Sequence, residues 1–318
     1  MSALSLRPPG PWMFVQWDES ASKTVMVARG RRIECSRLLR DPQMALLRGF
    51  ASRAEAEHVI EVAKPHLHPS RVVSYAKTGD AGVMSAARTS ESCKVVAAAD
   101  VVVRRLVQRA AYLTGLSPQH SEAVQVVHYR PGAEYRAHHD WFSPENERFA
   151  DKTDVAGNRL VSFFVYLADC EAGGCTAFPL LKRTFHPHVG NAVCWYNLDR
   201  AGTRDARTLH AGEPVLAGEK WGMNIWLRER AKPVSTLTPP PSSSSAGQPS
   251  TAAAPQESDR PTGGAHAATA ARCAACGDVD TPIGLCLCSS RYEQGGGAVS
   301  SAVAQAVATA ARRHRVAA

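Results

Sequence analysis

The chain has 318 residues, 44% of them hydrophobic, and a formal net charge of +8 at pH 7. This length accommodates one large domain or two modest ones, and the apolar fraction is sufficient for a buried core. No run of about eighteen apolar residues is present, so no membrane-spanning helix is expected. Nucleic-acid binding is disfavoured, because it needs a concentrated basic face and the basic clusters at residues 29–32 and 312–315 are short.

Cysteine usage and the N-terminus bear on the cellular compartment. The nine cysteines are an odd number, and those before residue 232 are scattered rather than arranged as a small disulfide framework. Residues 1–10 lack a basic start followed by a long apolar stretch, so no secretory signal is expected. We therefore expect reduced thiols and a cytoplasmic or nuclear location. Cys170 and Cys175 flank a Gly-Gly turn and could approach each other, but free thiols are favoured there too.

The first third of the chain is expected to hold two helices. Residues 1–40 are interpreted as an N-terminal extension, in which 12–15 and 25–27 are either two strands of an added hairpin or parts of a draped segment. Ser52 begins a capping-box pattern ahead of apolar residues at helical spacing, which predicts a helix that ends at Pro65. A second helix is predicted over residues 95–116, and the segment between the helices is expected to be irregular. Both helices should pack on the outside of a sheet.

From residue 123 onward, the apolar pattern changes to a period of two. Strands are expected over residues 123–129, 160–167, 175–178, 192–196 and 220–227. In the last of these, Lys220, Gly222, Asn224 and Trp226 alternate with apolar residues, which predicts one polar and one apolar face. Many short strands separated by turns favour a mainly β protein with flanking helices and a double-stranded β-helix core of the jelly-roll or cupin type.

A histidine and a carboxylate lie two residues apart at His138 and Asp140. Side chains at i and i+2 of an extended segment point to the same face, so a cation could bind between them while His139 faces away. A third candidate ligand is His210. Two imidazoles and one carboxylate leave open positions on a metal, the arrangement that suits non-haem Fe(II). Two short antiparallel strands after His210 would bring the Lys220 ammonium to the rim of such a site, where it could bind an anionic carboxylate.

These motifs occur in order with three others, namely Arg88-Thr89-Ser90, the segment from Gly173 to Pro179, and the segment from Asp205 to His210. Over residues 41–231, the chain resembles the catalytic domain of prolyl 4-hydroxylases, which are Fe(II)- and 2-oxoglutarate-dependent dioxygenases. The resemblance implies the following roles: Fe(II) ligands His138, Asp140 and His210; a 2-oxoglutarate carboxylate bound by Lys220; a second hydrogen bond to that co-substrate from Tyr129; and a peptide site lined by Trp226. Arg88 could either hold substrate or brace its loop.

The activity implied by this resemblance is hydroxylation of peptidyl-proline to 4-hydroxyproline. The reaction would consume O2 and 2-oxoglutarate, release succinate and CO2, and use L-ascorbate to rescue oxidised iron. A proline-containing peptide or protein is the implied partner, and the oligomeric state is not indicated. Two alternatives are an oxygenase on the same scaffold that acts on another peptide residue or a small molecule, and a catalytically silent jelly-roll binding module. Cys175 stands where the family often has Glu.

The C-terminal third has a different composition. Residues 232–270 are rich in Pro, Ser and Ala and are expected to form a disordered linker. Residues 271–318 contain four cysteines that could hold one tetrahedral zinc ion: Cys273, Cys276, Cys286 and Cys288. The segment resembles the opening of a MYND-type zinc finger, but the later ligands of that finger have no match. A disordered tail is the alternative.

Overall fold

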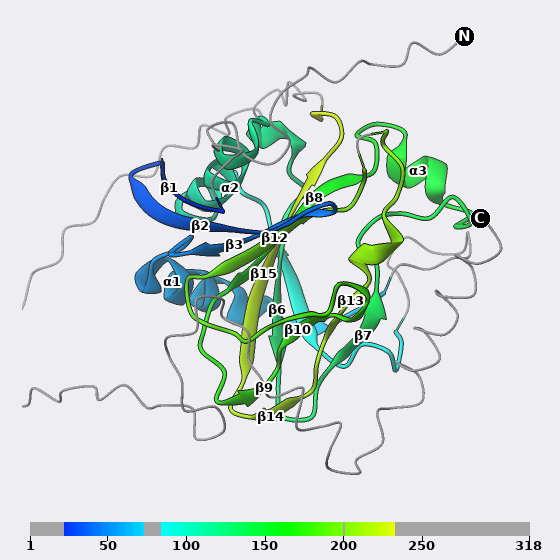
Figure 1. Cartoon of the computed structure of the whole chain (residues 1–318). Coiled ribbons are helices and arrows are strands. Elements are labelled where there is room, and N and C mark those ends of the chain that lie inside the picture. The colour runs from blue at the N-terminus through cyan, green and yellow to red at the C-terminus, as the bar shows by residue number, and fades with distance from the viewer. Residues whose placement is uncertain (1–21, 73–83, 200, 233–318) are drawn as a thin grey trace, which may run out of the picture.

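The computed structural model describes residues 22–72, 84–199 and 201–232. Its centre is a nine-stranded antiparallel sheet with the order β1-β2-β3-β12-β8-β15-β6-β5-β4 (Figure 1). The strands of this sheet are β1 (Lys23–Ala28), β2 (Arg31–Arg40), β3 (Gln43–Arg48), β4 (His68–Pro69), β5 (Glu91–Val95), β6 (Val124–Tyr129), β8 (Arg159–Tyr166), β12 (Ala192–Tyr196) and β15 (Lys220–Arg228). Residues 23–40, assigned to an extension from sequence, thus form two strands at its edge.

A second, four-stranded sheet has the order β11-β10-β13-β7. Its strands are β7 (Tyr135–His138), β10 (Thr176–Phe178), β11 (Arg183–Phe185) and β13 (His210–Gly212), and a further pair is formed by β9 (Ala172–Gly173) and β14 (Val215–Ala217). From β6 to β15 the chain passes repeatedly between the two larger sheets, while β10 and β11 form a hairpin within the smaller one. This alternation is the double-stranded β-helix, or jelly roll, and the predicted fold class is confirmed.

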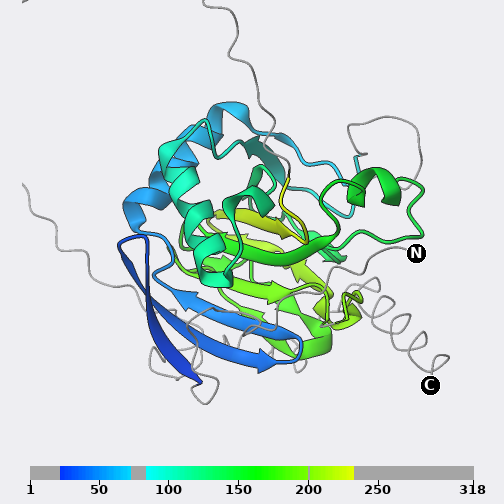
Figure 2. The ribbon, with the colours of Figure 1, turned by 90° about the horizontal axis from the view of Figure 1, so that it is seen from above.

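The nine-stranded sheet is buried on both faces. On one face, α1 (Arg53–Ala63) and α2 (Val101–Thr114) cover a core that includes Trp221, Met223, Ile225 and Leu227 of β15 (Figure 2). The other face contributes to a second core, shared with β10 and β11 of the smaller sheet. The alternation predicted for the last strand is therefore present. Because the apolar face of β15 is held by the helices, its Lys220 side is directed towards the smaller sheet.

The two predicted helices are present, with one boundary shifted. The capping box of α1 is formed, with Ser52 Oγ 3.0 Å from the Glu55 amide and Glu55 Oε2 2.8 Å from the Ser52 amide. Helix α2 begins at Val101, later than expected, because the Asp100 carboxylate caps its first turn. Residues up to Val95 instead pair with β6 as strand β5. The segment between the helices is therefore not wholly irregular.

Several shorter elements complete the described chain. They are α3 (Phe149–Thr153) and the 3-10 turns η1 (Lys64–His66), η2 (Pro118–His120), η3 (Pro179–Leu181) and η4 (Ala206–Thr208). The two short strands expected after His210 exist, but β13 pairs with β7 and β10 while β14 pairs with β9, so they do not form a hairpin with each other. Cys170 and Cys175 are not joined by a disulfide, as favoured from sequence.

None of the described helices has the length and apolar character needed to cross a bilayer. Three of the expectations concern segments outside the described residues: the strand or draped segment at 12–15, the linker after residue 232, and the four candidate zinc cysteines. The expected compartment stays a prediction.

A buried ion pair connects α1 to α2, and its contribution to stability can be tested. Arg109 is 1% exposed, and its guanidinium lies 2.9 and 3.1 Å from the two carboxylate oxygens of Glu55. We expect Arg109→Met to lower the free energy of unfolding by about 3–5 kcal/mol, because it leaves the Glu55 carboxylate buried without its partner. Urea denaturation measures this effect. Arg105→Met is the matched control, because Arg105 lies 3.8 Å from the same carboxylate but is half exposed, and its loss should cost less than about 1 kcal/mol.

Candidate metal centre

Three of the predicted site residues converge at one point between the two sheets. One ligand atom from each of His138, Asp140 and His210 lies within 4.8 Å of the others. Asp140 Oδ1 is 4.0 Å from His138 Nε2 and 3.8 Å from His210 Nε2. Asp140 and His210 are buried, whereas the His138 side chain keeps 21% of its surface exposed. The group is therefore enclosed on one side and reachable from the other.

Backbone pairing brings the two histidines together. His138 is the last residue of β7 and His210 the first of β13, and the two are Cα partners in the antiparallel ladder. Each imidazole is oriented by its Nδ1, which lies 2.9 Å from a carbonyl oxygen, that of Arg136 for His138 and that of Thr208 for His210. Because a carbonyl only accepts, Nδ1 carries the proton and the Nε2 lone pair faces Asp140.

The carboxylate of Asp140 is divided between two functions. Its Oδ2 accepts hydrogen bonds from Ser162 Oγ at 2.6 Å and from Trp226 Nε1 at 3.0 Å. Its Oδ1 faces the histidines. Although burial opposes ionisation of Asp140, the neighbouring histidines and Arg159 outweigh that effect and lower the pKa of Asp140 to about 2. The group is therefore an anion with one oxygen left to bind a cation.

Burial also sets the charge of His138. Desolvation, together with the neighbouring His210, lowers the pKa of His138 well below its ordinary value, so the imidazole is neutral at neutral pH. A neutral imidazole is the form that binds a metal. Tyr135 stacks on the His138 ring with centroids 3.6 Å apart, and Phe178 stacks on the His210 ring at 5.3 Å. Two imidazoles and one carboxylate, held by packing, fit a divalent metal of the Fe(II) type.

Lys220 is almost fully buried and lies on the same side of β15 as this centre. Its ammonium is 3.4 Å from the Cys175 carbonyl and 3.5 Å from Thr176 Oγ1, and no carboxylate of the described residues lies within ion-pair distance. Burial lowers the pKa of Lys220 to about 8. A buried ammonium without an ion pair is costly, so the site is suited to an anionic ligand.

Gly212 keeps space open between Lys220 and Tyr129. A Cβ placed on Gly212 would lie 3.6 Å from both Lys220 Nζ and Tyr129 Oη, so any larger side chain would enter the gap between these groups. Burial raises the pKa of Tyr129, which keeps its hydroxyl protonated and able to donate. A carboxylate in this gap would meet one ammonium and one hydroxyl, the donors that a dicarboxylic co-substrate requires.

The remaining predicted site residues lie close to the centre but are well packed. Trp226 is 7% exposed, and its indole donates to Asp140 while Arg159 stacks on its ring at 3.6 Å. Arg88 is buried, donates to Ser90 and Gln125, and lies over the Tyr135 ring at 4.6 Å, so its observed contacts are those of a brace. His139 points away from the triad to the Ala206 carbonyl, at 3.0 Å, as expected.

Sequence reasoning missed the residues that support Asp140. Arg159 forms a bidentate pair with Glu122 at 2.8 and 3.0 Å, and its Nη1 is 3.4 Å from the Asp140 carbonyl. Ser162 holds the carboxylate itself. The signal available in sequence was positional only, because residues 162, 164 and 166 of a strand share one face. Nothing in the residue types indicated which face would meet the metal.

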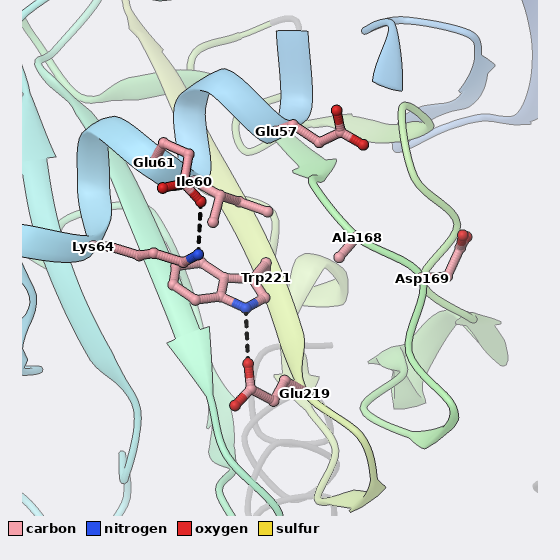
Figure 3. A pocket seen from close by; sticks show the side chains of 8 residues that line it. All are labelled: Glu57, Ile60, Glu61, Lys64, Ala168, Asp169, Glu219 and Trp221. Carbon is pink, nitrogen blue, oxygen red and sulfur yellow. Dashed lines mark hydrogen bonds and ion pairs between the residues drawn. The ribbon is translucent and has the colours of Figure 1, made fainter. Parts of the chain in front are cut away.

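A separate pocket of about 480 Å³ lies on the helix side of the large sheet (Figure 3). It is lined by Glu57, Ile60, Glu61, Lys64, Ala168, Asp169, Glu219 and Trp221. Trp221 faces this pocket, whereas its neighbour Lys220 faces the opposite side of the strand. The pocket contains none of the predicted site residues and is distinct from the metal centre.

Residues 124–228 match the family model for the 2OG-Fe(II) oxygenase superfamily. They are similar to a 2OG-Fe(II) oxygenase domain. This part of the chain and its flanks are 38% identical over 191 residues to prolyl 4-hydroxylase subunit alpha-1 from Homo sapiens, in an alignment that covers 60% of this chain and 35% of the relative. The human alpha-3 subunit is 39% identical over 193 residues and is covered to 34%. The chain thus spans about a third of the length of the curated relatives it matches.

The chain is also similar to a solved structure. The viral collagen prolyl hydroxylase of Paramecium bursaria Chlorella virus-1, in complex with 2OG, is 27% identical to this chain, with a TM-score of 0.45. The alignment covers 58% of this chain and 95% of the viral protein. The name of the superfamily states the cofactor and co-substrate, Fe(II) and 2-oxoglutarate, that the domain is expected to use.

Proposed function

We propose that this chain is an Fe(II)- and 2-oxoglutarate-dependent dioxygenase that hydroxylates peptidyl-proline to 4-hydroxyproline. The observation that carries the proposal is the convergence of two imidazoles and one carboxylate within 4.8 Å, inside a domain of the 2OG-Fe(II) oxygenase superfamily. The relatives named prolyl 4-hydroxylase subunits support proline as the substrate residue. We assign the activity to residues 41–231, together with the edge strands β1 and β2.

In this proposal, His138, Asp140 and His210 hold Fe(II). When bound, iron supplies the redox chemistry in which O2 is consumed, 2-oxoglutarate is oxidised to succinate and CO2, and one oxygen atom is inserted into a substrate C–H bond. The protein keeps the His138 imidazole neutral and Asp140 ionised, so these two ligands are in their metal-binding forms without a proton having to leave. The burial of Asp140 and His210 excludes water from one side of the centre.

Lys220 and Tyr129 are proposed to bind the far carboxylate of 2-oxoglutarate. The ammonium supplies charge and the phenol supplies a hydrogen bond, and both act in a site from which water is largely excluded. A charge-assisted hydrogen bond is stronger there than in water. Trp226 and Arg88 are proposed to line the peptide side of the centre. They would act mainly through their neighbours, Trp226 through Asp140 and Arg88 through Tyr135.

The other cofactor assignments rest on the sequence. We propose that L-ascorbate sustains turnover by reducing iron that has been oxidised in uncoupled cycles. A zinc ion held by Cys273, Cys276, Cys286 and Cys288 remains the proposal for the C-terminal tail. Metal analysis of the full chain purified in the presence of zinc, compared with a Cys273→Ser variant, tests this second assignment.

Turnover with a panel of proline-containing peptides tests the proposed function. We expect release of succinate that depends on both Fe(II) and 2-oxoglutarate, together with a peptide product heavier by one oxygen atom. Amino-acid analysis should identify 4-hydroxyproline in that product. Oxidation at another residue would instead support the alternative oxygenase on the same scaffold. If the metal-loaded protein released no succinate with any peptide, the catalytically silent binding module would be favoured.

A further inference from the structure

Three fully buried polar groups connect Asp140 to the interior of the large sheet. Ser162 on β8, Asn197 just after β12 and Trp195 on β12 have exposures of 0%, 0% and 1%. Trp195 Nε1 is 2.9 Å from Asn197 Oδ1, Asn197 Nδ2 is 2.9 Å from Ser162 Oγ, and Ser162 Oγ is 2.6 Å from Asp140 Oδ2. The result is a continuous chain of hydrogen bonds that ends on the proposed metal ligand.

The chemistry of the first group sets the direction of every bond in this chain. An indole N–H can only donate, so the Asn197 oxygen faces Trp195 and the Asn197 amide nitrogen faces Ser162. The Asn197 nitrogen donates, so the Ser162 oxygen accepts on that side. The one proton of the Ser162 hydroxyl is therefore left for Asp140. The network therefore fixes the Ser162 hydroxyl as a hydrogen-bond donor to Asp140 Oδ2.

The same network also reaches the second ligand. The Trp195 ring packs edge-on against the His210 imidazole, with centroids 4.8 Å apart and planes inclined by 62°. Trp195 therefore contacts one proposed ligand by packing and the other through Asn197 and Ser162. Asp140 and His210 belong to the side of the smaller sheet, whereas the network lies in the larger one. The large sheet thus contacts two proposed ligands that it does not itself carry.

Burying three polar groups in an apolar core is unfavourable unless each is satisfied, and apolar residues of similar size would pack without that requirement. The network is thus explained by what it does to Asp140. Ser162 and Trp226 together occupy Oδ2 with two donors, so that only Oδ1 is free for the cation. Outer hydrogen bonds of this kind orient metal ligands and tune their affinity.

We propose that Ser162 is a positioning residue for the metal centre, and that Asn197 and Trp195 orient its hydroxyl so that Asp140 binds metal through Oδ1 alone. This inference rests on the proposed function, because it takes Asp140 as a metal ligand. It assigns a role in metal binding to residues that bind neither metal nor substrate directly.

Anaerobic titration with Co(II) alone tests the proposal without turnover. For Ser162→Ala, we expect the dissociation constant for Co(II) to rise about 10- to 100-fold, the usual effect of removing an outer partner of a ligand. The visible absorption of bound Co(II) should also change, because a released Oδ2 alters the coordination. Asn197→Leu should give a smaller rise, since the Ser162 hydroxyl remains but is no longer oriented.

Thr114→Val is the matched control. Thr114 carries a buried hydroxyl on α2 that donates only to the carbonyls of its own helix. Its loss is expected to alter thermal stability but not the Co(II) titration or spectrum. If a folded Ser162→Ala protein kept the wild-type Co(II) affinity and spectrum, the proposal would be overturned. If Ser162→Ala does not fold, the same criterion is applied to Asn197→Leu. If the wild type and His210→Ala bound Co(II) equally, the metal centre itself would be refuted.

Discussion

Replacement of His210 by alanine is expected to raise the dissociation constant for Fe(II) by more than about 100-fold, because loss of even an outer partner of a ligand costs about 10- to 100-fold. Succinate release should fall below detection at iron concentrations that saturate the wild type. Both effects are expected because His210 supplies one of the three ligand atoms in the cluster, so its loss leaves only two. Anaerobic metal titration and a succinate assay measure the two effects separately.

His188→Ala is the control for loss of a histidine. The His188 side chain is 63% exposed and lies nearest to Asp169, outside the proposed centre. Its removal should change neither metal affinity nor succinate release. Wild-type metal affinity in His210→Ala would contradict the assignment of His210 as a ligand.

Replacement of Lys220 by methionine should weaken 2-oxoglutarate binding by about 2–5 kcal/mol, the usual cost of removing one partner from a buried charge pair. Methionine keeps the length of the side chain but not its charge. The KM for 2-oxoglutarate should therefore rise much more than the dissociation constant for Fe(II). Lys94→Met, which removes an exposed lysine from β5, should alter neither quantity. A normal KM in Lys220→Met would refute the proposed carboxylate site.

The pKa of Lys220 adds a pH dependence to the same site. Burial lowers this pKa to about 8, so the ammonium is charged below pH 8 and loses its proton as the pH rises. A bound carboxylate favours the charged form, so binding takes up a proton above pH 8. The KM for 2-oxoglutarate should be flat below pH 8 and should then rise by up to about tenfold per pH unit. The rise should be absent in Lys220→Met, and an identical rise in both proteins would assign it to another group.

The parts of this protein that were predictable from sequence are those with a strong local signal. Ser52 and Glu55 have the spacing of a capping box, which is typical of a helix start, and α1 begins there. Two-residue alternation located β6, β8, β12 and β15. His138, Asp140 and His210 were identifiable because two imidazoles and a carboxylate suit a metal and because they lie in an ordered set of motifs that resembles the prolyl 4-hydroxylases. The structure brings the three together.

The missed parts depend on contacts between distant segments. Ser162 and Asn197 are ordinary residues for a strand and its end, and their meaning comes from the sheet that places them next to Asp140. Strand β5 was expected to be part of a helical or irregular stretch, because Val95 fits the apolar pattern of the helix that follows. Its pairing with β6 decides otherwise. Likewise, β14 pairs with β9, and β9 is too short for an alternating pattern to predict it.

The pairing of His138 with His210 has a consequence for redesign. Their separation is a property of the ladder between β7 and β13, and both residues are held at strand ends by main-chain hydrogen bonding. Residues 142–158 lie outside this ladder, so their replacement is expected to leave the spacing of the two histidines unchanged. Redesign of that segment and preservation of the two imidazoles thus concern different parts of the chain.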